Sequence, residues 1–241
     1  MLHIDHLTKH YKGSTKGVTD LTLYIEPGDL YAFIGHNGAG KITTLKCVAG
    51  IQGWDSGSIT VCGKDLAADP MGCKGEMAYI PDNPDLYEYL TGIQYLNFIA
   101  DVFSIPAGER EELIRRYADP FELTSSLGDL ISTYSHGMKQ KLAVLSALIH
   151  KPRLLLLDEP FVGLDPAAAL MLKDIMRGIC AQGGAIFFST HVLDVAEKLC
   201  NKVAIIKEGR LVAAGDMETL VKPGASLEEL FMEVANRAET D

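Results

Sequence analysis

Residues 35–42 read Gly-His-Asn-Gly-Ala-Gly-Lys-Ile. Gly35, Gly40 and Lys41 match the pattern G-x-x-x-x-G-K-[ST], a glycine-rich turn whose backbone N–H groups and lysine hold the phosphates of a nucleoside triphosphate. The last position of the pattern requires a hydroxyl, and this chain has Ile42 there. Because that hydroxyl normally ligates Mg2+, the stretch predicts nucleotide binding together with a damaged magnesium site.

The residues around this loop supply the strand and the helix between which such a loop lies. Residues 30–34 are a short apolar run, which predicts a buried strand. Residues 41–49 have helical character, and Gly50 follows at a position suited to a C-cap. A chance glycine-rich turn is the alternative, and this context argues against it. The loop residues expected to contact the nucleotide are Gly35, Asn37, Gly38, Ala39, Gly40, Lys41, Ile42 and Thr43.

The second motif is an acidic pair at the end of an apolar run. Residues 154–159 read Leu-Leu-Leu-Leu-Asp-Glu. The run is typical of a strand covered on both faces, and ligands bind at the carboxyl ends of such strands. We expect Asp158 to hold Mg2+ and Glu159 to orient or deprotonate an attacking water. An acidic pair at a helix N-terminus is the alternative, and the phosphate loop favours the functional interpretation.

Residues 134–141 read Tyr-Ser-His-Gly-Met-Lys-Gln-Lys and precede an apolar helical segment. This stretch resembles the signature motif of ATP-binding-cassette (ABC) ATPases, which is usually Leu-Ser-Gly-Gly-Gln. Tyr134 replaces the Leu and His136 replaces the first Gly. Ser135 and Gly137 keep the hydroxyl and the backbone N–H at a helix start that touch phosphate. For Ser135 alone, an ordinary N-cap is the alternative.

Further segments match the same family in the same order. Residues 163–166 resemble its D-loop, which implies a role for Asp165 in catalysis. Residues 189–191 resemble its switch motif, which implies that His191 contacts the γ-phosphate. Tyr11 resembles the aromatic residue that stacks on adenine, and a strand tyrosine without a ligand is the alternative.

The resemblance also identifies a second departure in the metal site. After the strand-like residues 78–81 the family usually has Gln, whose amide reaches Mg2+ and the attacking water. Here the position is Asp82, whose carboxylate can still bind a cation with a different charge and reach. Ile42 and Asp82 therefore alter two groups of the expected metal sphere. Thr to Ile requires one base change, so a natural and an introduced Ile42 both stay open.

Composition narrows the classes of partner and the cellular compartment. The net charge of −10 argues against nucleic acid as the main partner. Five cysteines without C-x-x-C spacing indicate thiols in a reducing compartment. We expect no signal peptide, and no apolar run approaches the ~18 residues that span a bilayer. If the resemblance to ABC ATPases extends to transport, it implies a channel on another chain and places this one in the cytoplasm, peripheral on the inner face of the membrane.

The expected fold class is α/β, a P-loop ABC ATPase core with an antiparallel β subdomain and an inserted helical subdomain. Residues 1–82 and 154–215 would form the core with its antiparallel strands. Residues 83–153 would form the helical subdomain that carries the signature motif, and residues 216–241 a C-terminal helical tail. An amphipathic tail helix that packs on the core is predicted from the spacing of Leu227, Leu230, Phe231 and Val234.

Residues 91–103 predict a helix that is apolar over more than half of its surface. One apolar face can cover the core of its own subdomain. The other face, with Tyr95, Phe98 and Val102, is expected to receive a transmembrane partner. Complete burial within the subunit is the alternative.

The resemblance implies the ATP-binding subunit of a bacterial ABC transporter of the exporter type, which hydrolyses ATP with Mg2+. It further implies a transmembrane permease subunit and a homodimer or heterodimer of ATPase subunits, in which Lys41 faces Ser135 of the other protomer. One alternative is an ATP-binding scaffold whose hydrolysis is impaired by Ile42, and another is a soluble ABC ATPase without a transport role. A GTPase is disfavoured, because residues 201–204 lack the Asp of a guanine motif.

Overall fold

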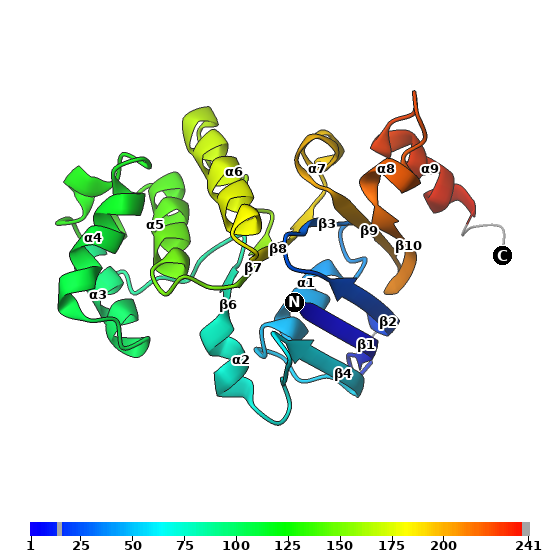
Figure 1. The fold of residues 1–241 in the computed structure, drawn as a ribbon, viewed down its shortest axis with the longest axis horizontal. Coiled ribbons are helices and arrows are strands. Elements are labelled where there is room, and N and C mark those ends of the chain that lie inside the picture. Colours follow the sequence, from blue (N-terminus) through cyan, green and yellow to red (C-terminus); the bar gives the residue numbers. More distant parts are fainter. Residues whose placement is uncertain (14–15, 238–241) are drawn as a thin grey trace.

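The computed structural model of the chain describes residues 1–13 and 16–237. Figure 1 shows strands gathered toward one end of the molecule and helices α3, α4 and α5 at the other. The described strands are β1 (Leu2–His10), β2 (Gly17–Ile25), β3 (Leu30–Ile34), β4 (Ser56–Val61), β5 (Lys64–Asp65), β6 (Met77–Ile80), β7 (Leu154–Asp158), β8 (Ala185–Thr190), β9 (Lys202–Lys207) and β10 (Arg210–Asp216).

The described helices begin with α1, which follows the phosphate loop, and end with α9 in the tail. None of them is long and apolar enough to cross a lipid bilayer. They are α1 (Lys41–Val48), α2 (Pro70–Glu76), α3 (Gly92–Val102), α4 (Ala107–Ala118), α5 (His136–Leu148), α6 (Pro166–Ala181), α7 (Leu193–Leu199), α8 (Met217–Leu220) and α9 (Leu227–Arg237), with short 3-10 turns at Thr124–Ser126 and Ile131–Thr133.

The larger sheet has six strands in the order β10-β9-β3-β8-β7-β6. Strands β9, β3, β8, β7 and β6 run parallel, and β10 is an antiparallel edge. Every residue of β3, β7 and β8 is buried, as expected for parallel strands covered on both faces. The apolar runs at residues 30–34 and 154–157 therefore form the central strands that their composition indicates.

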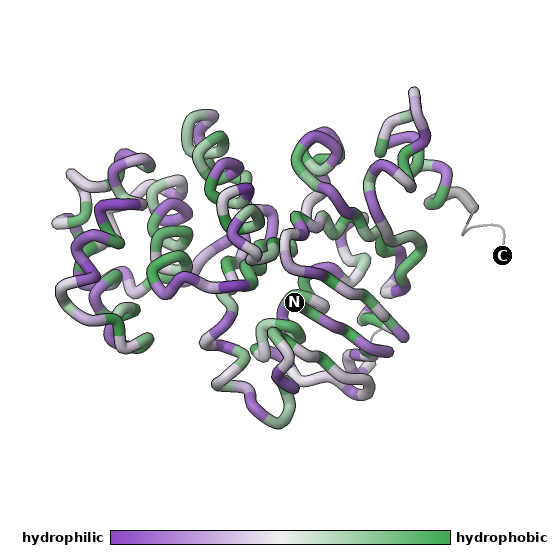
Figure 2. The backbone as a smooth tube through the Cα atoms, viewed as in Figure 1, coloured by the Kyte–Doolittle hydropathy of each residue, from purple (hydrophilic) through white to green (hydrophobic). Residues whose placement is uncertain are grey.

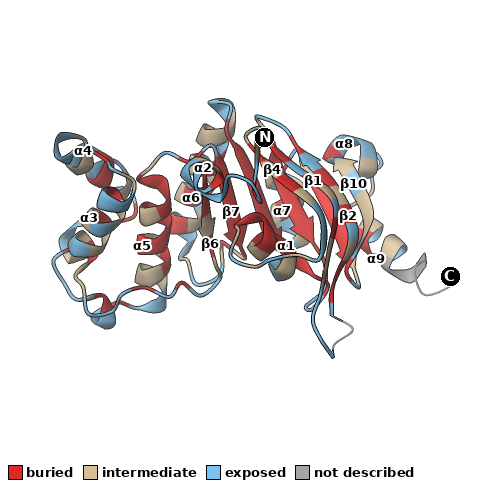
Figure 3. Cartoon of the chain, turned by 90° about the horizontal axis from the view of Figure 1, so that it is seen from below, coloured by how far each residue is buried: buried red, intermediate tan, exposed pale blue. Residues whose placement is uncertain are grey.

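The smaller sheet is antiparallel, with the order β2-β1-β4-β5. Figure 2 shows hydrophobic and hydrophilic residues alternating along β1 and β2, so one face of this sheet is apolar. Figure 3 shows buried residues along this sheet and along the strands of the larger sheet. One apolar cluster joins both sheets to α1, because Ile4, Phe33 and Leu45 belong to it.

Helices α3, α4 and α5 pack on one another at the far end of the molecule (Figure 1). Helix α3 begins with a capping box, in which the Thr91 side chain accepts from Gln94 N and the Gln94 side chain accepts from Thr91 N. Leu96 and Ala100 are buried, whereas Phe98 and Val102 are 42% and 60% exposed. The predicted second apolar face of this helix is therefore open to solvent at these two residues.

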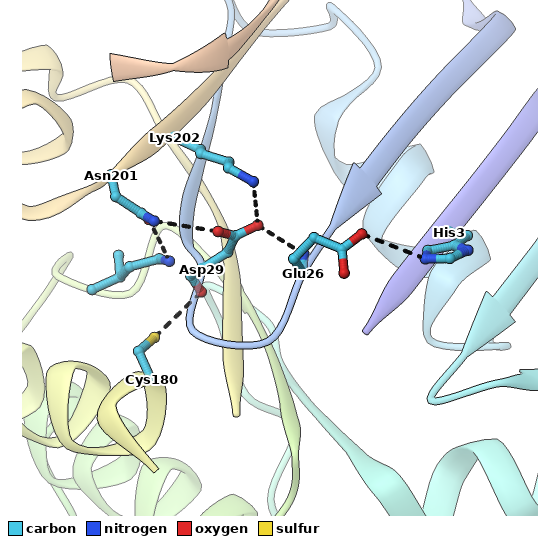
Figure 4. A network of polar contacts seen from close by, with 7 residues as sticks. His3, Glu26, Asp29, Cys180, Asn201 and Lys202 are labelled. Carbon is cyan, nitrogen blue, oxygen red and sulfur yellow. Dashed lines mark hydrogen bonds and ion pairs between the residues drawn. The ribbon is translucent and has the colours of Figure 1, made fainter. Parts of the chain in front are cut away.

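A polar network holds the amino-terminal ends of the central strands β3 and β9 (Figure 4). The buried Asp29 carboxylate accepts from Glu26 N at 2.7 Å, Lys202 Nζ at 3.0 Å and Asn201 Nδ2 at 3.2 Å. Asn201 Oδ1 accepts from Leu30 N at 2.8 Å. These contacts tie the starts of β3 and β9 to the β2–β3 turn, and so set where the parallel strands begin.

We predict that Asp29→Ala lowers the free energy of unfolding by about 2–3 kcal/mol, because it leaves buried donors without their acceptor. Urea denaturation followed by circular dichroism measures this. The control is Asp194→Ala, since Asp194 is exposed and lies 3.9 Å from Lys198. The control should change stability by less than about 0.5 kcal/mol. Equal midpoints for both variants would show that the Asp29 network adds no net stability.

Candidate functional site

The phosphate loop forms one wall of a pocket at the carboxyl edge of the parallel sheet. The pocket has a volume of about 350 Å³. It brings together the loop, the acidic pair and Asp82, which are far apart in the sequence. The lining residues are Tyr11, Lys16, Gly17, His36, Asn37, Gly38, Gly40, Lys41, Ile42, Thr43, Asp82, Asp158 and Glu159.

The loop has the local geometry of an anion cradle. Gly38 and Gly40 have φ values of 83° and 112°, a region of backbone conformation that favours glycine. Gly40 is the N-cap of α1 and provides no side-chain cap, so the first N–H groups of the helix are available to an anion. Gly35 and Ala39 do not line the pocket, and these two predicted contacts can act only through the shape of the loop.

The Lys41 ammonium is folded back onto the loop. It donates to the Gly35 carbonyl at 2.5 Å and to the His36 carbonyl at 3.3 Å. Burial lowers the pKa of Lys41, and the carboxylates of Glu159 and Asp158 partly offset this effect. A phosphate in the pocket would give the ammonium a charged partner in place of the two carbonyls.

Ile42 faces this pocket with an apolar side chain that is 47% exposed. The neighbouring hydroxyls are used elsewhere. Thr44 is fully buried and donates to the Gly40 carbonyl at 3.0 Å. The Thr43 hydroxyl lies 3.3 Å from that of Tyr11. Because successive residues are rotated by about 100° around a helix, we expect neither hydroxyl to point where the side chain of residue 42 points.

The acidic side of the pocket crowds carboxylates together. Asp158 is 2% exposed and accepts a hydrogen bond from the Ser189 hydroxyl. Burial raises the pKa of Asp158, and the charges of Asp82 and Glu159 raise it further, whereas Ser189 and Lys41 lower it. A cation near these carboxylates would relieve their repulsion.

The donors present fit a magnesium ion only in part. Asp158 and Asp82 offer carboxylate oxygens to one pocket, and Ile42 offers none. Within residues 1–13 and 16–237, no group of three or more His, Cys, Asp or Glu side chains is placed to hold a metal ion. An ion here would need further oxygen ligands from a nucleotide phosphate or from water.

Glu159 adopts a strained backbone, with φ of 45°. Its N–H is shared between the Ser189 carbonyl and hydroxyl, each at 3.2 Å. Its Oε1 lies 2.9 Å from His191 Nδ1. A left-handed conformation costs a non-glycine residue about 1–3 kcal/mol and is concentrated at functional sites. The structure thus pairs two side chains that were each predicted to serve catalysis.

The signature and D-loop residues lie outside this pocket. Ser135 is the N-cap of α5 and accepts from Met138 N at 3.3 Å. Asp165 is the N-cap of α6 and pairs with Lys141 at 2.8 Å, which lowers the pKa of the Asp165 carboxyl. A Cβ on Gly137 would lie 2.8 Å from the Gly163 carbonyl, so the two segments touch each other.

Three pocket residues were not anticipated from the sequence, namely Lys16, Gly17 and His36. His36 occupies a variable position of the loop pattern, so the pattern carries no information about it. Gly17 approaches the loop closely, because a Cβ on Gly40 would lie 3.0 Å from the Gly17 carbonyl. Lys16 precedes that glycine in the sequence. The only sequence signal for its place in the pocket was a lysine close to the turn that follows Tyr11.

Comparisons with known proteins agree with this arrangement. A family model described as "ABC transporter" matches residues 18–162. The ABC-type transporter ATP-binding protein EcsA of Bacillus subtilis is 32% identical over 238 residues, which cover 97% of this chain and 96% of that protein. The Nod factor export ATP-binding protein I of Burkholderia thailandensis is 32% identical over 205 residues, which cover 85% of this chain and 67% of that protein.

A solved structure of the ATP-binding subunit of an ABC transporter superimposes with a TM-score of 0.92. It is 34% identical in sequence, and the match covers 98% of this chain and 99% of that one. The α/β fold, with its parallel and antiparallel sheets, is thus shared with a protein of known class. The chain belongs to the ABC transporter family and is an ABC-type ATPase.

Proposed function

We propose that this chain hydrolyses ATP to energise export through a separate membrane subunit. The observation that carries the proposal is the meeting of the phosphate loop with Asp158 and Glu159 in one pocket. The similarity to a Nod factor export protein supports export as the direction. A phosphate-binding loop opposite a general base is the arrangement that phosphoryl transfer to water needs.

In this proposal the loop and Lys41 hold the β- and γ-phosphates, and Tyr11 stacks on the adenine. Tyr11 lines the pocket, and its hydroxyl donates to Gln52 Oε1 at 2.9 Å, which holds the ring in place. Asp158 and Asp82 would hold Mg2+, which, when bound, neutralises charge that develops on the phosphates. Glu159 takes a proton from the water that attacks the γ-phosphate, and ADP leaves with inorganic phosphate as the other product.

His191 is proposed to make hydrolysis depend on the presence of a γ-phosphate in the pocket. Its Nδ1 lies 2.9 Å from Glu159 Oε1, and its side chain is 60% exposed. A γ-phosphate in the pocket would compete with Glu159 for the imidazole. Glu159 would then be released toward the attacking water only when ATP is present.

The signature segment supports a head-to-tail dimer, either of two copies or with a paralogue. Ser135 is exposed and is absent from the pocket of its own chain. Its hydroxyl and the N–H of Gly137 at the start of α5 form a second phosphate-binding surface. In the proposed dimer this surface closes over the phosphate pocket of the other protomer, so that two ATP molecules lie between the subunits.

The first prediction from this model concerns assembly. Glu159→Gln combined with Ile42→Thr should form a dimer in the presence of ATP, because nucleotide binds while the water is not deprotonated. Size-exclusion chromatography with and without ATP measures this. Adding Ser135→Arg to the same background is the control, which should stay monomeric. A double variant that remains monomeric at saturating ATP would contradict the sandwich.

The second prediction concerns Ile42 and separates an active ATPase from an ATP-binding scaffold. Ile42→Thr should raise kcat by about tenfold to a thousandfold, since metal stabilisation is worth several kcal/mol and each 1.4 kcal/mol is tenfold. Steady-state ATPase assays across a range of Mg2+ concentrations measure this. Ile42→Val is the matched control, because valine has the shape of threonine without its hydroxyl.

The valine control should leave kcat near that of the unaltered chain. Equal kcat for the Ile, Val and Thr forms at millimolar Mg2+ would show that water or another side chain replaces the missing ligand. In that case Ile42 does not impair hydrolysis, and the scaffold alternative loses its basis.

Docking of the membrane subunit is proposed at an apolar pocket of about 480 Å³ beside α3, α5 and β6. Tyr95, Ile99 and Phe103 line it. The ring centroid of Tyr95 lies 6.0 Å from that of Tyr87, which lies 5.6 Å from that of Phe98, and Tyr87 and Phe98 are 45% and 42% exposed. An exposed aromatic cluster beside an apolar pocket is typical of a protein interface.

This docking pocket is connected to the phosphate pocket by the segment after β6. Asp82 lines the phosphate pocket, whereas Pro81 and Pro84 line the apolar one. A change in the position of Asp82 on nucleotide binding would therefore be felt by a segment docked beside the prolines. This continuity supports the proposal that closure around ATP drives the membrane subunit.

The third prediction tests this surface. Phe98→Asp and Val102→Asp should abolish association with the membrane subunit and leave ATP binding nearly unchanged, because both side chains are exposed. Co-purification of the two subunits and nucleotide titration measure the two effects. Leu170→Asp is the control, since Leu170 is 58% exposed on α6. Unfolding of the Phe98 and Val102 variants would assign this face to the core.

Tyr95 is half-buried, so its substitution tests packing as well as docking.

A further inference from the structure

The tail helix α9 contacts the phosphate loop. Its first residue Leu227 is fully buried, and Phe231, one turn later, is 9% exposed. The ring of Phe231 meets the ring of His36 edge-on, with centroids 5.0 Å apart and planes at 61°. His36 is the second residue of the loop and lines the phosphate pocket. The outer side of the loop is thus in contact with the far end of the chain.

His36 connects this contact to the lysine of the site. Its carbonyl accepts from Ala39 N at 3.1 Å, which closes the turn, and from Lys41 Nζ at 3.3 Å. Its ring lies against Phe231. One residue therefore carries both a carbonyl that accepts from the ammonium, beside the closer Gly35 carbonyl, and the ring that the tail contacts. A displacement of the ring would move that carbonyl and the turn that it closes.

The same helix is also anchored to the switch side of the site. Leu227 N donates to Glu197 Oε2 on α7 at 2.8 Å. Helix α7 begins two residues after His191. Figure 1 shows α9 at the end of the molecule where α7, α8 and β10 lie. The tail is thereby held by an element of the ATPase core, and this anchor gives Phe231 a defined place against the loop.

We propose that Phe231 is a positioning residue for ATP binding, which acts on the phosphate loop through His36. Lys41 donates to the Gly35 and His36 carbonyls. When phosphates arrive, the ammonium leaves these carbonyls, and the contact with Phe231 keeps the loop in the shape that receives them. The inference rests on the proposed binding of ATP in this pocket.

The key variant is Phe231→Leu, which keeps an apolar side chain of suitable size and removes the aromatic edge. It should weaken MgATP binding by about threefold to tenfold, the worth of one edge-to-face aromatic contact. Phe231→Tyr keeps the ring and should restore binding to within about twofold. Titration of the full chain with a fluorescent ATP analogue measures the Kd without requiring turnover.

A double-variant cycle separates positioning from general packing. If Phe231 acts through His36, the His36→Ala and Phe231→Leu variant binds no more weakly than His36→Ala alone. Thermal unfolding of each variant reports any loss of stability independently of the Kd. Met232→Ala is the control on the same helix, since Met232 is 52% exposed, and it should change neither quantity.

An unchanged Kd for Phe231→Leu would overturn the inference, and so would effects of His36→Ala and Phe231→Leu that multiply in the double variant. Failure of the unaltered chain to bind the analogue would instead overturn the proposed ATP site. The two failures are therefore distinguishable in one set of titrations.

Discussion

The parallel pairing of β3 with β8 and of β8 with β7 is the constraint on which the site depends. Ile34 is paired with Thr190, and Asp158 with Ser189. All three strands are buried along their length, so polar groups can appear only where the strands end. The register brings the phosphate loop, the acidic pair and the switch segment to one edge. The Asp29 network at the opposite end sets where two of the strands in this sheet begin.

Electrostatics governs the polar contacts at this edge of the sheet. A nearly buried ammonium and several carboxylates share one pocket, and the ammonium bonds to carbonyls of its own loop. Carbonyls are weaker partners for a cation than phosphate oxygens, so the loop can release Lys41 to a nucleotide. Asp158 and Glu159 use Ser189 and His191 as partners in the same way. Lys41, Asp158 and Glu159 are thus each held by a polar partner within the chain.

Local pattern and family motifs predicted the strands, the loop, the acidic pair and the helix that carries the signature, because each depends on residues close in sequence. Other features depend on contacts that sequence distance does not reveal. The ion pair of Asp165 with Lys141, the use of Gln94 in a helix cap and the contact of Phe231 with His36 belong to this group. The positive φ of Glu159 was equally hidden, because composition carries no signal for strain in a non-glycine residue.

The residues after β6 have a mechanical consequence. Proline has a fixed φ and lacks an N–H group, and Pro81 and Pro84 flank Asp82 within four residues. The backbone here has fewer soft torsions than an ordinary loop of the same length. We therefore expect this segment to be stiffer than an ordinary loop of the same length, so that a displacement of Asp82 also shifts Pro84 in the apolar pocket.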